Sequence, residues 1–242
     1  KQLAYFIGIH VGDGTLSFDK KKSHYIIGYT GHLEDEYYFH KNIITSWIKE
    51  LFNKDVTIKE DRRPNRSSIR TYFKSKAIFT FLSKTIKLPI GTKNGHGIPD
   101  IIKQSNKNIK INFLRGLADT DFSLTFKSKG KPFNYYPVIS FTSVSKELVY
   151  EINNLLNELS FKTYHLVDRK EYYAKRDIYY TGSSININGR KNLDLWMEKI
   201  GFTSEKHLTK YKVWKKFGFC PPKTSLNQRK EILKGTLDIN NF

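Results

Sequence analysis

The chain opens with a segment that is apolar on nearly every side. Residues 3–11 read LAYFIGIHV and end at Gly12-Asp13-Gly14. A helix without a polar face is buried, and a glycine-flanked acid is typical of a helix end, so we expect a buried helix that stops near Asp13. β-Branched and aromatic residues over 15–18 and 25–29 lie on both sides of a basic turn, as in a β-hairpin.

The hydrophobic spacing then changes to a helical period. Apolar residues recur at helical spacing over 33–52, which predicts an amphipathic helix. Strand-like segments follow at 56–59 and 69–73 across the charged loop 61–66, and a short helix is predicted at 77–85. One unit therefore reads helix, two strands, helix, two strands, helix.

The same order begins again after a connector rich in Gly, Pro and Asn at 88–108. Equivalent positions are about 108 residues apart, so the chain is a duplication and not a short-period repeat protein. We divide it into residues 1–108, residues 109–200 and a basic extension, 201–242, whose segments 206–217 and 226–233 have helical character. The elements predicted for the second unit are a helix at 109–118, strands at 123–127 and 138–142, a helix at 148–159, strands at 163–167 and 179–187, and a helix at 193–200.

The charge of the chain points to a polyanionic partner. Its 242 residues contain 42 Lys and Arg against 23 Asp and Glu, a net charge of +19. With 38% hydrophobic and 14% aromatic residues, this charge belongs to a folded domain and not to a disordered tail. Nucleic acid is the expected partner, with an acidic membrane face as the weaker competitor. No apolar run is long enough to span a membrane, no signal peptide opens the chain, and the lone Cys220 fits a reducing compartment, so we expect an intracellular protein.

Two helix ends carry the candidate chemistry. Ala4, Gly8 and Gly12 form a ridge with almost no side chain on the first helix, and Gly116 and Thr120 occupy the matching places on the second. Such ridges let two helix backbones approach closely.

An acid follows each ridge, Asp13 on the first helix and Asp121 on the second. If the helices pack ridge to ridge, the two carboxylates come together and would repel unless a hard divalent cation lies between them. That arrangement is suited to metal-assisted hydrolysis of a phosphodiester. For one helix alone, tight packing and a capping Asp would explain the pattern, but the duplication repeats it at the same point of both units.

Both segments resemble one known sequence motif. Residues 6–14, FIGIHVGDG, and 114–122, LRGLADTDF, are similar to the LAGLIDADG motif. The chain resembles the single-chain, two-motif LAGLIDADG homing endonucleases of archaeal or organellar type over roughly residues 3–200. The resemblance implies an α+β fold of duplicated αββαββα units with pseudo-two-fold symmetry. It also implies two antiparallel four-stranded DNA-binding sheets, with helices packed at the central interface.

The resemblance also implies roles for individual residues. The last acid of each motif, Asp13 and Asp121, would bind the metals, with the backbone carbonyls of Gly12 and Thr120 as additional ligands. The family places a Lys or Arg after the fourth strand of each repeat, near the reactive phosphate. Lys76 and Arg190 resemble those residues. Mg²⁺ is the expected cofactor, with Mn²⁺ expected to substitute and Ca²⁺ to bind without supporting cleavage.

The sequence departs from the motif at a few positions. Phe122 stands where the motif prefers Gly and is expected to reshape the turn into the strand. His10-Val11 replaces the usual Ile-Asp, so Asp119 has no counterpart in the first repeat. The candidates for a water-organising residue on the second strand of each repeat are Gly28 or Gly31, and Ser140.

Polar strand positions form the candidate DNA-reading surface. A twisted antiparallel ribbon fits the major groove of DNA, and alternate side chains of a strand face opposite ways. For a single residue, a solvated strand edge is an equally good explanation, but the density of basic residues favours binding. The hairpins of the two units differ, which predicts a long, non-palindromic target. The candidate DNA-binding residues are Lys20, Lys22, His24, Arg62, Arg63, Arg66, Arg70, Lys74, Lys127, Lys129, Lys131, Arg169, Lys170, Lys175 and Arg176.

The remaining residues separate the competing functions. The seven His are scattered and are interpreted as phosphate contacts or surface residues. Lys1 is not a splicing nucleophile, so a free-standing or intron-encoded enzyme is expected and not an intein. The leading hypothesis is a monomeric, Mg²⁺-dependent double-strand DNA endonuclease in the cytoplasm of an archaeon or an organelle matrix.

Two alternatives remain open. One keeps the fold as an RNA maturase, with intron RNA as partner, or as a non-cleaving DNA-binding regulator. The other is a membrane-surface or nucleotide protein with residues 12–14 as a phosphate loop, although the Lys and helix start of that fingerprint are absent.

Overall fold

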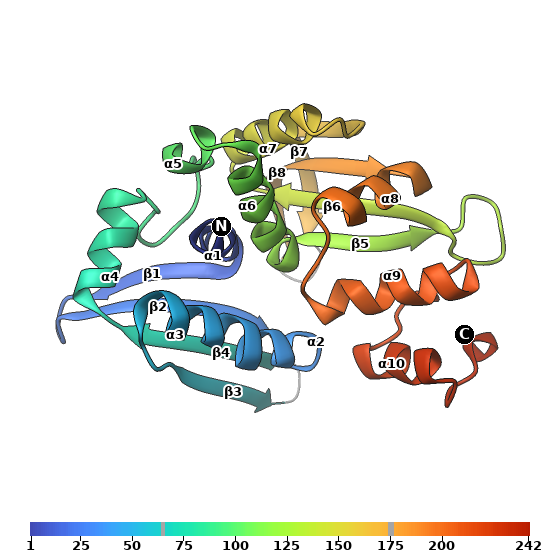
Figure 1. The fold of residues 1–242 in the computed structure, drawn as a ribbon, viewed down its shortest axis with the longest axis horizontal. Helices are drawn as coiled ribbons and strands as arrows, with labels where there is room; N and C mark the ends of the chain where they lie inside the picture. The colour runs from blue at the N-terminus through green and yellow to red at the C-terminus, as the bar shows by residue number, and fades with distance from the viewer. Residues whose placement is uncertain (64–65, 174–176) are drawn as a thin grey trace.

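Two units of the same design lie side by side in the computed structural model (Figure 1), which describes residues 1–63, 66–173 and 177–242. In each unit, helices cover one face of a four-stranded sheet. The first unit consists of α1 (Gln2–Asp13), β1 (Gly14–Asp19), β2 (His24–His32), α2 (Leu33–Tyr38), η1 (Phe39–Ile44), α3 (Thr45–Phe52), β3 (Thr57–Arg63), β4 (Arg66–Lys74), α4 (Lys76–Thr80) and η2 (Phe81–Thr85).

The second unit repeats this order after a connector that contains the short α5 (Asp100–Lys103). Two further helices and a final turn follow it along the chain. The elements are α6 (Lys107–Thr120), β5 (Phe122–Lys127), β6 (Tyr136–Ser143), α7 (Lys146–Glu158), β7 (Thr163–Tyr173), β8 (Ile178–Asn188), α8 (Arg190–Lys199), α9 (Glu205–Phe217), α10 (Leu226–Lys234) and η3 (Ile239–Asn241). The predicted α+β fold with two duplicated units is confirmed.

The two sheets have the same antiparallel topology. Their strand orders are β1-β2-β4-β3 and β5-β6-β8-β7. In the first sheet Leu16, Ile27 and Ile69 are fully buried beneath the helices, and in the second Leu124 and Ile185 are. Because side chains alternate along a strand, the intervening residues of each strand lie on the face without helices.

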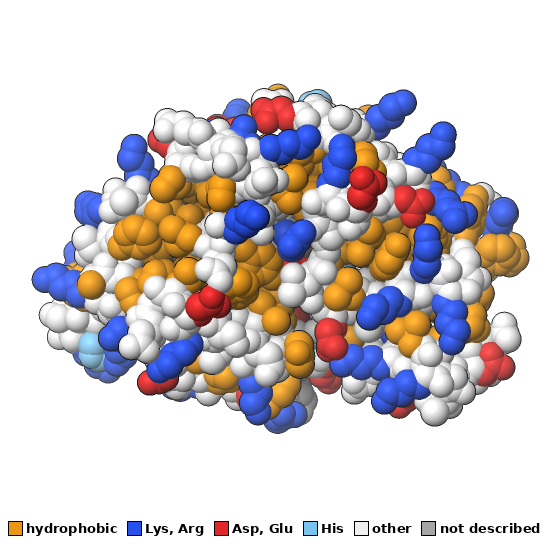
Figure 2. All heavy atoms as spheres, viewed as in Figure 1, with side chains coloured by type: hydrophobic (Ala, Val, Ile, Leu, Met, Phe, Trp, Pro, Cys, Tyr) orange, Lys and Arg blue, Asp and Glu red, His pale blue; other side chains and the backbone are white. Residues whose placement is uncertain are grey.

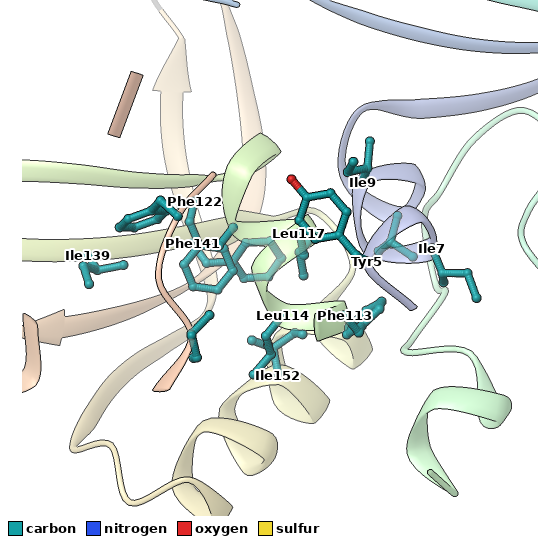
Figure 3. Packing of buried hydrophobic residues seen from close by; sticks show 14 of the residues in the cluster. Tyr5, Ile7, Ile9, Phe113, Leu114, Leu117, Phe122, Ile139, Phe141 and Ile152 are labelled. Atoms are coloured by element: carbon teal, nitrogen blue, oxygen red, sulfur yellow. The ribbon is translucent and has the colours of Figure 1, made fainter. Parts of the chain in front are cut away.

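The central interface is the contact between α1 and α6. Space for a side chain is missing on both ridges: a Cβ at Gly8 would overlap the Phe113 carbonyl, and one at Gly116 would overlap the Tyr5 carbonyl. Figure 3 shows Tyr5 of α1 beside Leu117 of α6, with Phe141 and Phe122 of the second unit on the other side of Leu117. The predicted ridge-to-ridge packing is therefore observed, and it lets buried residues of both units form one hydrophobic core.

The C-terminal extension packs against the second sheet. Trp214 of α9 stacks on Phe126, and its indole Nε1 donates to the Tyr135 carbonyl at 2.7 Å. Lys210 donates to the Leu124 carbonyl of the edge strand β5 at 3.1 Å. In the first unit the equivalent edge is bonded by the connector, because Gly91 N–H donates to the Leu16 carbonyl.

Two strand pairs are longer than the sequence indicated. Residues 61–63 and 66, expected in a charged loop, belong to strands β3 and β4, and β7 continues past residue 167 to Tyr173. These ends project as two-stranded ribbons that lack a buried face, so no hydrophobic alternation marks them in the sequence. In β7 an extra residue between Leu166 and Arg169 forms a bulge.

No helix among the residues described is both long and apolar enough to cross a membrane.

Candidate functional site

The two predicted acids lie at the adjoining C-terminal ends of α1 and α6. A Cβ built on Gly12 would lie 3.4 Å from the carboxyl carbon of Asp121 and would overlap the Thr120 side chain. Asp13, the last residue of α1, is half-buried. Asp121 is exposed and lines a recess between the connector and α7. The structure therefore brings the two helix ends together as the sequence indicated.

The environment raises the pKa of both carboxyls. Loss of hydration, followed by the negative charges of Asp121 and Glu36, raises the pKa of Asp13 to about 8. Loss of hydration in the recess also raises the pKa of Asp121, to about 6, while the nearby ammonium groups of Lys93 and Lys206 oppose this rise. The smaller shift belongs to the more exposed acid. Without a further cation, the site disfavours the doubly ionised pair.

Lys93 of the connector is one cation at this site, and it was not among the residues expected from the sequence. Its Nζ donates to the carbonyls of His10 at 3.2 Å, Val11 at 3.0 Å and Gly12. These carbonyls belong to the last turn of α1. That of His10 also accepts from the Gly14 N–H, whereas those of Val11 and Gly12 lie beyond the last main-chain donor of the helix. Burial lowers the pKa of Lys93, and the charges of Asp121 and Asp13 act in the opposite direction.

Lys206 of α9 is the second cation, and it reaches the site from the C-terminal extension. Its Nζ lies 2.6 Å from Oε1 of Glu36, a buried acid of α2. The positive charge of Lys206 lowers the pKa of both Asp13 and Asp121. Lys93 follows Asp13, and Lys206 follows Asp121, by a similar number of residues. Both ammonium groups approach the paired acids.

The donor atoms at the helix ends fit a hard divalent cation. Two carboxylates and main-chain carbonyls are oxygen ligands that Mg²⁺ accepts. The pKa of Asp13 is raised first by burial and then by the charges of Asp121 and Glu36, and a bound cation would oppose both effects. Within residues 1–63, 66–173 and 177–242, no three His, Cys, Asp or Glu side chains gather as a metal cluster. Any metal here would therefore need main-chain, water or substrate oxygens in addition to Asp13 and Asp121.

The basic residues predicted to follow the fourth strands have other contacts. Lys76 Nζ lies over the Tyr25 ring, 5.8 Å from its centroid. The guanidinium of Arg190 lies over Trp214 and approaches Asp194 at 3.7 Å. The cations that act on the pKa of both acids are Lys93 and Lys206. The sequence signal that could have found them is their similar separation from the acids, because Lys93 follows Asp13 by 80 residues and Lys206 follows Asp121 by 85.

Phe122, which stands where the motif prefers Gly, packs into the core of the second unit. It is 2% exposed and stacks on Phe141 at a centroid distance of 4.9 Å. In the first unit Gly14 is required because a Cβ there would overlap the His10 ring and backbone. The second unit has Ala118 at the position equivalent to His10, which leaves room for an aromatic side chain.

Asp119 links three segments of the chain. It is fully buried, accepts from the Tyr5 hydroxyl at 2.6 Å, and accepts from the N–H groups of Thr203 and Ser204 at 2.7 and 2.8 Å. Burial raises its pKa to about 6 against these hydrogen bonds. Asp119 therefore anchors the beginning of the C-terminal extension at the end of α6.

The three candidates for a water-organising residue differ in placement. Gly28 lies under the Arg70 side chain, whose Nε would be 3.5 Å from a Cβ there. Gly31 faces the helices, because its Cβ would overlap Glu36 and His40. Ser140 lies on the helix-free face and shares a hydrogen bond of 2.8 Å with Ser123.

The strand register divides the predicted DNA-binding residues between two faces. Arg62 points to the helix side of its strand, and the β7 bulge places Arg169 on the helix-free face and Lys170 on the opposite one. Figure 2 shows Lys and Arg side chains spread over the visible surface of both units. Lys175 and Arg176 lie outside the described residues, and so does the Arg66 side chain. Those on the helix-free faces are His24, Arg63, Arg70, Lys74 and Lys127, together with Arg169, and those in hairpin turns are Lys20, Lys22, Lys129 and Lys131.

Three of the seven His are buried, which corrects their assignment to the surface. His10, His40 and His207 are each 1% exposed. Burial lowers the pKa of His10 to about 3 and that of His40 to about 4. Each lies on the buried face of a helix, so they contribute to packing and are not phosphate contacts.

Comparison with known proteins identifies the architecture. A model of the LAGLIDADG-like domain matches residues 108–201. The replication factor C small subunit of Methanocaldococcus jannaschii is 28% identical over 174 residues, which cover 69% of this chain but 9% of that protein. The chain therefore spans a small part of this relative's length.

Solved structures with the same fold cover most of the chain. A mesophilic variant of the homing endonuclease I-DmoI superposes on this chain with a TM-score of 0.55 at 17% identity. The match covers 82% of this chain and 89% of that one. I-WcaI bound to its DNA recognition sequence has a TM-score of 0.53 at 18% identity, over 87% and 84%. I-GzeII in complex with its DNA target has a TM-score of 0.51 at 10% identity, over 98% and 93%. The resemblance to the LAGLIDADG family is thereby confirmed: residues 108–201 form a LAGLIDADG-like domain, and the chain has the single-chain, two-motif fold of that family.

Proposed function

We propose that the chain is a site-specific double-strand DNA endonuclease that depends on a divalent cation. The observation that carries this proposal is the pairing of Asp13 and Asp121 at adjoining helix ends, with the Lys93 and Lys206 ammonium groups beside them. Two carboxylates and two ammonium groups between two basic sheets can act on a phosphate of each strand of a duplex. The chain would do so as a monomer, because it contains both units.

The helix-free faces of the two sheets would bind the major groove on either side of the acids. Basic side chains on these faces and in the hairpin turns would contact phosphates and base edges. The first face carries Arg70 and Lys74, whereas the second carries Ser140, Asn186 and Arg169. Because these residues differ between the units, the target would be long and asymmetric.

Asp13 and Asp121 would hold the metal, with the carbonyls of Gly12 and Thr120 as further oxygen donors. When bound, a divalent cation activates water and stabilises charge on a departing phosphate oxygen. Mg²⁺ fits this oxygen donor set best, Mn²⁺ would substitute, and Ca²⁺ would bind without supporting cleavage. I-DmoI, which shares the fold, has been captured in complex with DNA and Ca and with DNA and Mn.

Lys93 and Lys206 would stabilise the negative charge that develops on the reacting phosphates. This role was expected from Lys76 and Arg190, and it passes to the two lysines because their charges act directly on the acids. Removing a preorganised cation of this kind lowers the rate by about 100-fold or more.

The test is a cleavage selection with Mg²⁺ over a library of randomised duplexes, followed by assays on the recovered target. We expect wild-type protein to cut both strands and EDTA to abolish cutting. Asp13→Asn and Asp121→Asn should each bind the target in Ca²⁺ with cleavage of at least one strand lowered by about 1,000-fold. Glu34→Gln, which changes an exposed acid of α2, is the matched control.

Recovery of a bound duplex that wild-type protein never cuts would contradict the proposal and favour the non-cleaving regulator. Cleavage by Asp121→Asn as fast as by wild type would contradict the assigned site. Binding of intron RNA in preference to every duplex would instead favour a maturase.

A further inference from the structure

We infer that Glu36 is a positioning residue that holds the Lys206 ammonium at the paired acids, so that one strand-cutting centre is assembled from the first unit and the C-terminal extension together. The inference rests on the proposed function and assigns a role to an acid outside the two motifs. It also gives α9 a part in the reaction beyond packing on the second sheet.

The Glu36 carboxylate is fixed before it meets Lys206. It is 6% exposed, and its Oε2 accepts from the His32 backbone N–H at 2.6 Å. Its other oxygen, Oε1, accepts from Lys206 Nζ at 2.6 Å. Gly31 lies directly against this carboxylate, because a Cβ there would overlap Glu36 and His40. The hydrogen bond from His32 and the contact with Gly31 therefore fix the position of the Glu36 carboxylate.

The donor also needs this acceptor. A Lys side chain has four rotatable bonds and would otherwise sample many rotamers, so ordering it has an entropic cost. An ammonium group has three N–H donors, so Lys206 can bond Glu36 and still donate to a phosphate oxygen. Glu36 thus restricts the position of the Lys206 ammonium group and leaves two of its N–H groups free to donate to substrate.

The backbone that carries Lys206 is anchored separately. Asp119 accepts from the N–H groups of Thr203 and Ser204 just before α9. Lys230 of α10 lies 2.6 Å from Glu205 in the first turn of that helix. The helix is therefore held from the second unit and from α10, which leaves the side chain of Lys206 as the part that Glu36 controls.

The charges place this pair at the acids and not at a remote surface. Glu36 and Lys206 both act on the pKa of Asp13, and both act on the pKa of Asp121, in opposite directions. Lys93 is held differently, by main-chain carbonyls of its own unit's helix. Of these two lysines, Lys206 is the one that is held by a carboxylate.

The test uses the full chain and the duplex recovered by the cleavage selection, with each strand labelled. Lys206→Met should lower single-turnover cleavage of one strand by about 100-fold. Glu36→Gln should lower cleavage of that same strand by about 10-fold, and leave the other strand and target binding in Ca²⁺ within about 2-fold. Because the two residues act as a unit, the double variant should cut no more slowly than Lys206→Met alone.

A second readout needs no DNA. Acetylation of Lys206 by a soluble acetylating ester, followed by mass spectrometry, should be several-fold faster in Glu36→Gln than in wild type, and Glu36→Asp should restore part of the protection. Glu34→Gln, an exposed neighbour on the same helix, should change neither acetylation nor cleavage.

Equal slowing of both strands, a double variant slower than Lys206→Met, or unchanged acetylation of Lys206 would overturn the positioning role. If wild-type protein cuts no duplex, the proposed function fails. The catalytic use of the ion pair then fails with it, whereas faster acetylation of Lys206 in Glu36→Gln would still show that Glu36 holds the ammonium group.

Discussion

The two units place equivalent acids with unequal surroundings. The first helix ends in Gly12-Asp13-Gly14, and its lysine, Lys93, caps the carbonyls of that same helix. The second helix ends in Thr120-Asp121-Phe122, and its lysine, Lys206, is bonded to an acid of the other unit. A duplicated fold can thus keep the position of two charges while each unit holds them by different atoms.

The residues beneath the acids show the same kind of exchange. His10 fills the space next to Gly14, whereas the second unit has Ala118 at the position of His10 and a buried Phe122 at the position of Gly14. The large side chain thus stands at the first of these two motif positions in the first unit and at the second position in the second unit. The same helix contact is therefore combined with different side-chain packing in the two units.

The largest expected difference is between two glycines of one helix. Gly8→Ala would push a Cβ into the Phe113 carbonyl, and we expect a loss of more than about 3 kcal/mol or failure to fold. Gly12→Ala meets the Thr120 side chain instead, so it should cost about 1–2 kcal/mol. Thr120→Ala removes the hydroxyl but keeps the Cβ at 2.8 Å, so it should recover part of that loss. Urea unfolding measures both.

In an ordinary exposed helix, Gly→Ala would stabilise by about 0.5–1 kcal/mol, so the sign of the change is diagnostic. A stabilising Gly8→Ala would contradict the main-chain contact between α1 and α6.

The next largest difference should be between the losses of protein stability caused by replacing Lys206 and by replacing Lys93. Lys206→Met leaves the Glu36 carboxylate buried without its cation, and we expect a loss of about 3 kcal/mol. Adding Glu36→Gln should restore part of it. Lys93→Met should cost about 1 kcal/mol, because helix-end carbonyls can accept from water. Chemical denaturation of the four proteins tests this order, and equal losses for the two lysines would show that Glu36 does not depend on Lys206.

The pH dependence should separate the two acids in metal-free protein. The folded pKa of Asp13, about 8, is above its usual value of 3.8, so the folded state binds more protons between these values. Stability contributed by the protonated form is therefore present at low pH and lost as pH rises toward 8. Because Asp13 is only half-buried, we expect a loss on the order of 1 kcal/mol between pH 5 and pH 8.

Asp13→Asn should remove this slope, whereas Asp121→Asn should change it less and mainly below about pH 6. Thermal melts at several pH values provide the measurement. Adding Ca²⁺ should raise stability more at pH 8 than at pH 5, and the opposite order would contradict metal binding by the ionised pair.

The smallest expected effect compares neighbours on β7. Arg169 lies on the helix-free face, and Lys170 points the other way because of the bulge. Arg169→Ala should weaken binding of the target duplex by about 1 kcal/mol and reduce the salt dependence by about one charge, while Lys170→Ala should do neither. Fluorescence anisotropy in Ca²⁺ at several salt concentrations measures this, and a larger effect of Lys170→Ala would place the DNA on the opposite face.

Sequence alone predicted the duplication, the order of helices and strands, and the two acids at paired helix ends. These features are local or periodic: buried faces repeat at 3.6 or 2 residues, and the spacing of Gly8, Gly12 and Gly116 is by itself enough to indicate a close helix contact. The polar ribbon ends of β3 and β7 escaped prediction because no buried face imposes a pattern on them.

Only the tertiary structure decided which cations serve the acids and which faces the basic residues occupy. Lys93 and Lys206 come from a connector and an extension without periodicity, and each meets the acids only after a complete repeat has folded between them. Glu36 joins the site because α2 of the first unit contacts α9 of the C-terminal extension. One inserted residue in β7 reverses Arg169 and Lys170, since side-chain direction depends on pairing register and not on residue type.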